Sequence, residues 1–155
     1  MRRWAVMMVM KTCKEVEKYI KIVRSGEVAV CQEQIMMCNL LEKILEKEDV
    51  YFDTDQLEKY LSFQKYFPYE LLPWELFCFA VHNTLYKDNG QLRFPVLVVI
   101  VGRGAGKNGY LAFEDFALIT PVNNIMHYDI DIFATSEDQA AATFNDIYDV
   151  LESNE

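Results

Sequence analysis

One stretch decides how the fold of this chain is interpreted, namely Phe94-Pro95-Val96-Leu97-Val98-Val99-Ile100-Val101-Gly102-Arg103-Gly104-Ala105-Gly106-Lys107-Asn108-Gly109. Its first eight residues are almost all apolar, which predicts a β-strand buried on both faces. A glycine-rich loop follows, ends in Gly-Lys, and leads into a helix expected to begin at Lys107. Such loops bind phosphate because glycines let the backbone amides turn inward, while the lysine and the positive helix end attract negative charge. We therefore predict phosphate binding at residues 102–108.

Two positions of the loop depart from the usual phosphate-binding pattern. Val101 stands where the first glycine is expected, and Asn108 stands where a serine or threonine hydroxyl normally ligates magnesium. The carbonyl oxygen of an asparagine is a neutral, hard ligand that can replace such a hydroxyl. The motif by itself is equally compatible with an ordinary turn after a strand.

Composition and charge narrow the class of protein. The 155 residues have the length of one domain, and their 52% hydrophobic content is enough for a sizeable core. A formal charge of −9 disfavours a nucleic-acid-binding surface, since phosphate contacts require clustered Lys and Arg. The four cysteines form no C-x-x-C pair, and their spacing fits reduced, cytosolic thiols better than a zinc site.

The first ten residues superficially resemble a signal peptide, because two arginines precede a short apolar run. The run is too short to span a bilayer, and no small-residue cleavage site follows it. We expect no membrane segment here or elsewhere in the chain.

Hydrophobic periodicity divides the chain into a helical half, residues 12–87, and a half in which strands and helices alternate, residues 94–152. Asp53 with Gln56, and Ser136 with Gln139, are spaced as helix-capping boxes. The turn Lys87-Asp88-Asn89-Gly90 closes the helical half. The expected helices cover 28–47, 53–65, 70–86, 107–119 and a last segment from 136, and the expected strands cover 94–101 and 129–135.

The same periodicity predicts which faces of the helices are buried. Acidic residues on the later helices are expected to lie on solvated faces or to interact with helix dipoles. The predicted buried stripes are Val28, Cys31, Ile35, Cys38, Leu41 and Leu45 in the 28–47 helix, and Ala140, Phe144, Ile147 and Leu151 in the last helix; the acidic residues are Glu114, Asp115, Glu137 and Asp138.

Four blocks of the sequence resemble, in order and in spacing, segments of the large subunit of tailed-phage terminases, the ATP-driven motors that package viral DNA. The blocks are Ser25-Gly26-Glu27-Val28-Ala29-Val30-Cys31, Leu72-Pro73-Trp74-Glu75, Val101-Gly102-Arg103-Gly104-Ala105-Gly106-Lys107-Asn108-Gly109 and Asp131-Ile132-Phe133-Ala134-Thr135-Ser136-Glu137-Asp138-Gln139-Ala140. The resemblance implies an α/β fold. A helical lead-in at residues 1–90 would precede, at 91–155, the first part of a P-loop ATPase domain, an incomplete three-layer sandwich of the RecA/ASCE type.

The resemblance also implies roles for individual residues, with ATP and Mg²⁺ as cofactors. Lys107 would meet the β- and γ-phosphates, and Arg103 would stabilise charge on the transferred phosphoryl group. Trp74 would flank the adenine, although packing within its helix explains it equally well. Glu75 replaces the usual glutamine, so it can only accept a hydrogen bond from the adenine amino group. The cradle for the phosphates would be Gly102, Arg103, Gly104, Ala105, Gly106, Lys107 and Asn108, with Asn108 also the candidate metal ligand.

The function implied is that of the N-terminal, ATP-binding portion of a terminase large subunit in the cytoplasm of a bacterial host. DNA, the small terminase subunit and the portal would be partners of the intact protein. The 155 residues end before the family's acidic ATPase strand and its nuclease domain, so we expect weak hydrolysis, exposed strand edges and poor folding of this chain alone. Two alternatives remain open: a helical module that docks a partner and carries a vestigial nucleotide site, and another P-loop ATPase such as a helicase-like protein.

Overall fold

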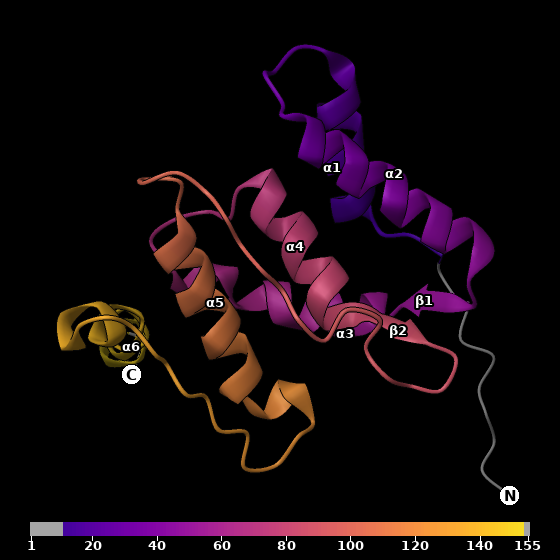
Figure 1. The fold of residues 1–155 in the computed structure, drawn as a ribbon. Helices are drawn as coiled ribbons and strands as arrows, with labels where there is room; N and C mark the ends of the chain where they lie inside the picture. Colours follow the sequence, from indigo (N-terminus) through magenta and orange to yellow (C-terminus); the bar gives the residue numbers. More distant parts are fainter. Residues whose placement is uncertain (1–10, 154–155) are drawn as a thin grey trace, which may run out of the picture. The chain divides into compact units, whose positions relative to one another are not determined.

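A computed structural model describes residues 11–153, so the predicted signal-like run within the first ten residues lies outside the described part. Of the residues that the structure describes, 60% are helical, and a small antiparallel sheet gives a mixed α and β composition. The elements, labelled in Figure 1, are α1 (Lys14–Ser25), α2 (Gln32–Lys47), β1 (Val50–Phe52), α3 (Thr54–Leu61), the 3₁₀ helix η1 (Ser62–Tyr66), α4 (Pro73–Thr84), β2 (Leu85–Lys87), α5 (Lys107–Ile119), the 3₁₀ helix η2 (Pro121–Asn123) and α6 (Glu137–Ser153).

The chain divides into two compact units. The first comprises the residues up to Leu57 together with Leu76–Leu97, and the second comprises Glu58–Glu75 together with the chain from Val98 onward. Both units therefore combine segments that are distant in sequence. Within residues 11–153, no helix has the length and apolarity that crossing a bilayer requires.

Helices α1 and α2 lie against each other in the first unit (Figure 1). Gly26 ends α1 in the left-handed conformation, with φ of 75°, which lets the chain turn back toward α2. The Tyr19 ring lies 4.7 Å from that of Phe77, and its hydroxyl accepts a hydrogen bond of 2.9 Å from Gln34 Nε2. Arg24 pairs with Glu42 across the two helices. Aromatic packing and a surface ion pair thus join α1, α2 and the C-terminal part of α4.

Strands β1 and β2 form an antiparallel pair in which Tyr51 lies opposite Tyr86. Their rings stack at 5.9 Å, as cross-strand aromatic neighbours do. A predicted turn follows β2, and Gly90 occupies it with φ of 78°. The sheet was not predicted, because the helical periodicity expected at 70–86 continues through residues that the structure assigns to β2.

The predicted strands at 94–101 and 129–135 are not formed in the described chain, whose one sheet is the β1–β2 pair. Val98 is 75% exposed, Ile100 90% and Phe133 92%. A strand requires a neighbour to satisfy its backbone amides and carbonyls, and residues 11–153 place none beside either segment. The expectation that this chain alone exposes apolar strand surface agrees with these exposures.

The predicted helices are present, but the buried faces of two of them differ from the prediction. The helix predicted at 28–47 begins only at Gln32, so Val28 and Cys31 precede α2 and are exposed. Within α2 the buried side chains are Cys38, Leu41 and Ile44, whereas Ile35 is exposed. In α6 the buried side chains are Thr143 and Val150, whereas Phe144 and Leu151, predicted to face inward, are exposed. An apolar stripe shows which residues can be buried, but the neighbours of a helix decide which of them are buried.

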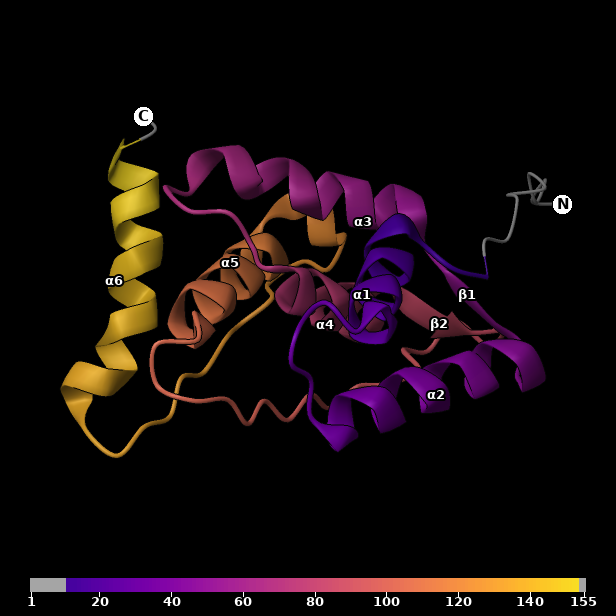
Figure 2. The ribbon, with the colours of Figure 1, turned by 90° about the horizontal axis from the view of Figure 1, so that it is seen from above.

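Helix α5 is the centre of the second unit. Aromatic rings of Phe63 and Phe67 meet those of Phe113 and Phe116 at 5.4–5.5 Å, which packs the segment before α4 against α5. Helix α6 contacts α5, and Figure 2 shows the two side by side. The prediction that Glu114 lies on a solvated face is wrong: its side chain is buried and accepts a hydrogen bond of 3.2 Å from the Tyr110 hydroxyl.

Candidate functional site

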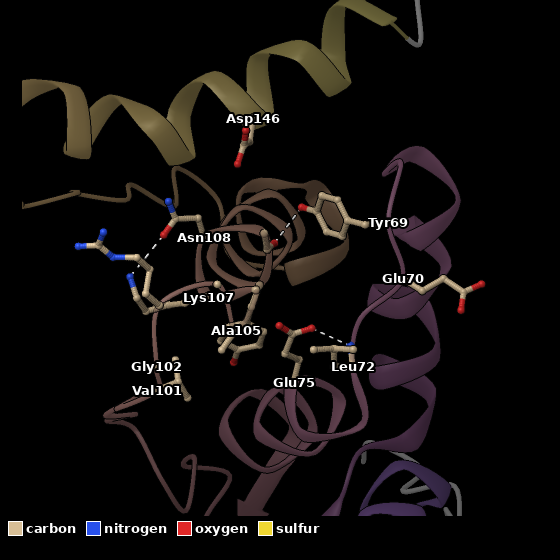
Figure 3. A pocket seen from close by; sticks show the side chains of 15 residues that line it. Tyr69, Glu70, Leu72, Glu75, Val101, Gly102, Ala105, Lys107, Asn108 and Asp146 are labelled. Atoms are coloured by element: carbon tan, nitrogen blue, oxygen red, sulfur yellow. Dashed lines mark hydrogen bonds between the residues drawn. The ribbon is translucent and has the colours of Figure 1, made fainter.

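A pocket of about 820 Å³ lies in the second unit, at the N-terminal end of α5 (Figure 3). It brings together the predicted phosphate loop, the residues before α4 and one side chain of α6. Its lining consists of Val101 to Tyr110, Tyr69, Glu70, Leu72, Glu75 and Asp146. The pocket therefore includes every predicted loop residue from Gly102 to Asn108, and Glu75 as well.

The loop combines a turn with the start of a helix. The amide of Ala105 donates to the carbonyl of Gly102 at 3.3 Å, and Gly104 and Gly106 take positive φ values of 81° and 88°. Glycine suits both positions because a Cβ is unfavourable in the left-handed region. Gly106 is the N-cap of α5, and the first helical bond runs from the Tyr110 amide to its carbonyl at 3.0 Å.

The amides of Lys107, Asn108 and Gly109 precede that first bond, so they belong to the open end of the helix. The first turn of α5 contains no acidic residue that would neutralise the positive end of the helix dipole. The local structure therefore offers backbone donors to an anion.

Two cationic side chains, Arg103 and Lys107, line the pocket and are exposed to solvent. Lys107 Nζ donates to Asn108 Oδ1 over 3.4 Å, a long, solvent-exposed bond (Figure 3). A bond of this length is weak, so phosphate oxygens can replace it at little cost.

Glu75 lies beneath the loop and is only 3% exposed. One carboxylate oxygen accepts a hydrogen bond of 2.7 Å from the amide of Leu72, in the manner of a third-position capping glutamate. The other oxygen lies against Gly106, where an added Cβ would sit 2.6 Å from it. Burial raises the pKa of Glu75, and the Leu72 bond opposes that rise. The residue predicted to read adenine thus caps α4 and supports the loop.

Tyr69 is a pocket residue that the sequence did not single out. Its hydroxyl donates a hydrogen bond of 2.9 Å to the carbonyl of Gly109, and a Cβ at Gly109 would meet the ring at 3.1 Å. Burial raises the pKa of Tyr69 to about 12, with the charges of Asp146 and Glu75 adding to the effect. No local pattern marks Tyr69, because its contact spans 40 residues of sequence.

Trp74 is not among the residues that line the pocket in the described chain. Its ring lies 5.9 Å from that of Tyr110 at an interplanar angle of 45°, and the side chain is half-buried. This contact is the packing role that was the alternative to flanking an adenine.

Oxygen donors from separate segments face the same pocket. Asp146 reaches it from α6 (Figure 3), and burial together with Asp149 raises the pKa of Asp146. Asn108 supplies a further oxygen atom, whereas the carboxylate of Glu70, another lining residue, points away from the loop (Figure 3). Magnesium is usually held by one or two carboxylates, waters and the phosphates of a substrate, and this donor set has the composition that such a site requires. Within residues 11–153, no three His, Cys, Asp or Glu side chains are grouped as a metal site of their own.

The geometry supplies backbone amides, two cations and carboxylates around one cavity, which suits a polyanion that carries a divalent cation. No protein-family model, curated protein or solved structure matches the chain at a significant level, so the interpretation of this site rests on its own residues.

Proposed function

We propose that the pocket binds the triphosphate of ATP as its magnesium complex. The observation that carries the proposal is the glycine-rich turn at 102–106, which leads directly into the open N-terminal end of α5, with Lys107 exposed at that end. Anions bind at helix N-termini because unpaired amides and the helix dipole act together. The sequence motif and the local geometry thus support the same ligand.

Each group has a distinct role in this proposal. Lys107 Nζ would leave Asn108 and contact the β- and γ-phosphates, while the amides of residues 102–108 would surround them. Arg103 would stabilise charge on the terminal phosphate. Magnesium, when bound, neutralises phosphate charge and orients the terminal phosphate. Its positive charge would also offset the repulsion between the phosphates and the carboxylates of the lining residues. Three of these residues are acidic (Glu70, Glu75 and Asp146), and they line the same pocket as the two cations.

The resemblance to terminase large subunits extends the proposal to the biological setting. In that setting the chain is the N-terminal, ATP-binding portion of a DNA-packaging motor in a bacterial host. DNA, the small subunit and the portal are then the partners of the intact motor. The exposed apolar segments at 94–101 and 129–135 would become strands of a three-layer sandwich once neighbouring strands are supplied. Their exposure supports this extension, since a strand inside a three-layer sandwich has its side chains buried by the helices on both faces.

Titration of the 155-residue chain with a fluorescent ATP analogue in the presence of Mg²⁺ tests the binding. We expect Lys107→Ala to weaken binding by about tenfold or more, because a charge-assisted hydrogen bond to phosphate is lost. Lys59→Ala is the matched control, since Lys59 is an exposed lysine of the same unit that does not line the pocket. Removal of Mg²⁺ with EDTA should also weaken binding.

Equal affinities for the native chain and the Lys107→Ala variant would remove the phosphate-loop assignment. Saturable binding of a protein partner, unchanged by ATP or by Lys107→Ala, would then favour the alternative function of a docking module with a vestigial nucleotide site.

A further inference from the structure

The charge of this protein is distributed very unevenly along the chain. Residues 108–155 contain ten of the 24 Asp and Glu residues and none of the 15 Lys and Arg residues. Residues 1–107 contain the other 14 acidic residues and all 15 basic ones, so they are nearly neutral. The whole formal charge of −9 therefore arises in the segment that contains α5 and α6.

Helix α6 carries an exposed apolar stripe within this acidic segment. Phe144 is 60% exposed, Tyr148 53% and Leu151 54%. Their spacing of four and three residues places them on one face of the helix. The rings of Phe144 and Tyr148 stack with centroids 6.4 Å apart and planes 23° apart. Thr143 and Val150 are the residues of α6 that are buried, so the stripe lies on a different face from the one that packs.

Acidic side chains flank the stripe. Glu137 lies seven residues before Phe144, so it shares the same face two turns earlier. Glu152 lies four residues after Tyr148, and its carboxylate accepts a hydrogen bond of 3.5 Å from the Tyr148 hydroxyl. Both carboxylates are exposed. The surface thus combines the elements of an interface, namely apolar anchors at the centre and a charged rim of one sign.

We propose that this face of α6, formed by Phe144, Tyr148 and Leu151 with Glu137 and Glu152 at its rim, binds a basic amphipathic helix of another protein. Apolar side chains of the partner at i, i+3 and i+4 would cover the two rings and the leucine, in the helix-against-helix mode of recognition. Lys and Arg residues beside those anchors would meet the carboxylates.

Charge decides between this partner and a second copy of the chain. Two copies that joined through α6 would place two acidic faces together, and like charges across an interface are unfavourable. A basic partner converts the same charges into attraction, which also accelerates association at low salt. The inference does not depend on nucleotide binding, because no residue of the stripe lines the pocket.

A synthetic peptide pair tests the proposal with the full 155-residue chain. The probe is a fluorescein-labelled helical peptide with Leu at i, i+3, i+4 and i+7 and Lys at its polar positions, and the comparison peptide has Glu in place of Lys. We expect saturable binding of the Lys peptide, weaker binding at high salt, and much weaker binding of the Glu peptide. Phe144→Ser combined with Tyr148→Ser should lower the affinity for the Lys peptide about tenfold or more, since central aromatic residues dominate interfaces.

Met36→Ser is the matched control, because Met36 is 60% exposed on α2, a helix of the other unit. Circular dichroism should show equal helix content for the native chain and both variants, since the substituted side chains are exposed. The proposal is overturned if the Phe144 and Tyr148 variant binds the Lys peptide as tightly as the native chain does. It is also overturned if both peptides bind equally, or if sedimentation shows dimers that this double variant abolishes.

Discussion

Replacement of Gly106 by alanine is the perturbation whose cost can be worked out most fully from this structure. Gly106 has φ of 88°, and an alanine in the left-handed region costs roughly 1–2 kcal/mol. The added Cβ would also lie 2.6 Å from Glu75 Oε1, so the buried carboxylate must move. We expect that movement to break the bond from the Leu72 amide, because the two carboxylate oxygens move as one rigid group, and a hydrogen bond to a charged group contributes about 1.5–3 kcal/mol. The total expected cost is about 2.5–5 kcal/mol.

Two neighbouring glycines separate these contributions. Gly104 has φ of 81° and nothing within 4 Å of an added Cβ, so Gly104→Ala should cost only the conformational part, roughly 1–2 kcal/mol. Gly102 has open space as well, and its φ lies outside the left-handed region, so Gly102→Ala should change stability by less than about 0.5 kcal/mol.

Native-state hydrogen exchange, read at the amides of Leu72 and Tyr110, reports the local opening free energy around the loop. We expect Gly106→Ala to destabilise the loop most, Gly104→Ala less and Gly102→Ala least. Only Gly106→Ala should reduce the protection of the Leu72 amide from hydrogen exchange. In a background of Glu75→Ala, Gly106→Ala should retain only its conformational cost, because the clashing carboxylate is absent. Equal costs for the Gly104 and Gly106 variants would refute the contact between Glu75 and the loop.

Three further outcomes follow from the structure. Tyr69→Phe removes the hydroxyl that donates to the Gly109 carbonyl. It should lower the local opening free energy by about 0.5–1.5 kcal/mol in hydrogen exchange read at the neighbouring Tyr110 amide, with helix content unchanged. Burial and the neighbouring Glu114 raise the pKa of Asp115 from 3.8 to about 6, so the folded state favours its neutral form. Urea-unfolding stability should therefore fall as the pH rises from about 4 to about 6, and the Asp115→Asn variant should lack that part of the decline. The chain should also enhance the fluorescence of an apolar dye such as ANS, and Val98→Ser should reduce the enhancement; dye binding as low as that of a well-packed domain would contradict the exposure of the segment at 94–101.

The helices were predictable because their signals are local. Helix α5 begins at Lys107 and ends at Ile119, as the periodicity and the loop indicate. The cap at Asp53 is confirmed by the bond of 2.9 Å that its carboxylate accepts from the Gln56 amide, and Ser136 accepts one of 3.4 Å from the Gln139 amide. Capping depends on side chains three residues from the amides they bond, so the sequence contains what is needed.

The strands and the walls of the pocket were less predictable because they depend on distant residues. The apolar run at 94–101 has the composition of a buried strand, but a strand exists only where another segment pairs with it. The pocket loop could be located from its glycines and lysine. Tyr69 and Asp146 could not, since only tertiary packing places them beside residues that lie about 40 positions away. Glu75 was identified for a role at a base, whereas its register at the start of α4 directs it to a backbone amide.

The contacts of Tyr69 and Glu75 also set an order of assembly during synthesis. Both residues leave the ribosome before the glycine-rich loop does, so the segment that supports the loop is made first. Chains emerge slowly, at about 5–20 residues per second, whereas a helix forms in about a microsecond or less. Residues 102–109 are therefore synthesised after both side chains that contact them, so the Tyr69 hydroxyl is available to the carbonyl of Gly109 when α5 nucleates. The costly first turn of that helix is stabilised by a side chain translated 40 residues earlier.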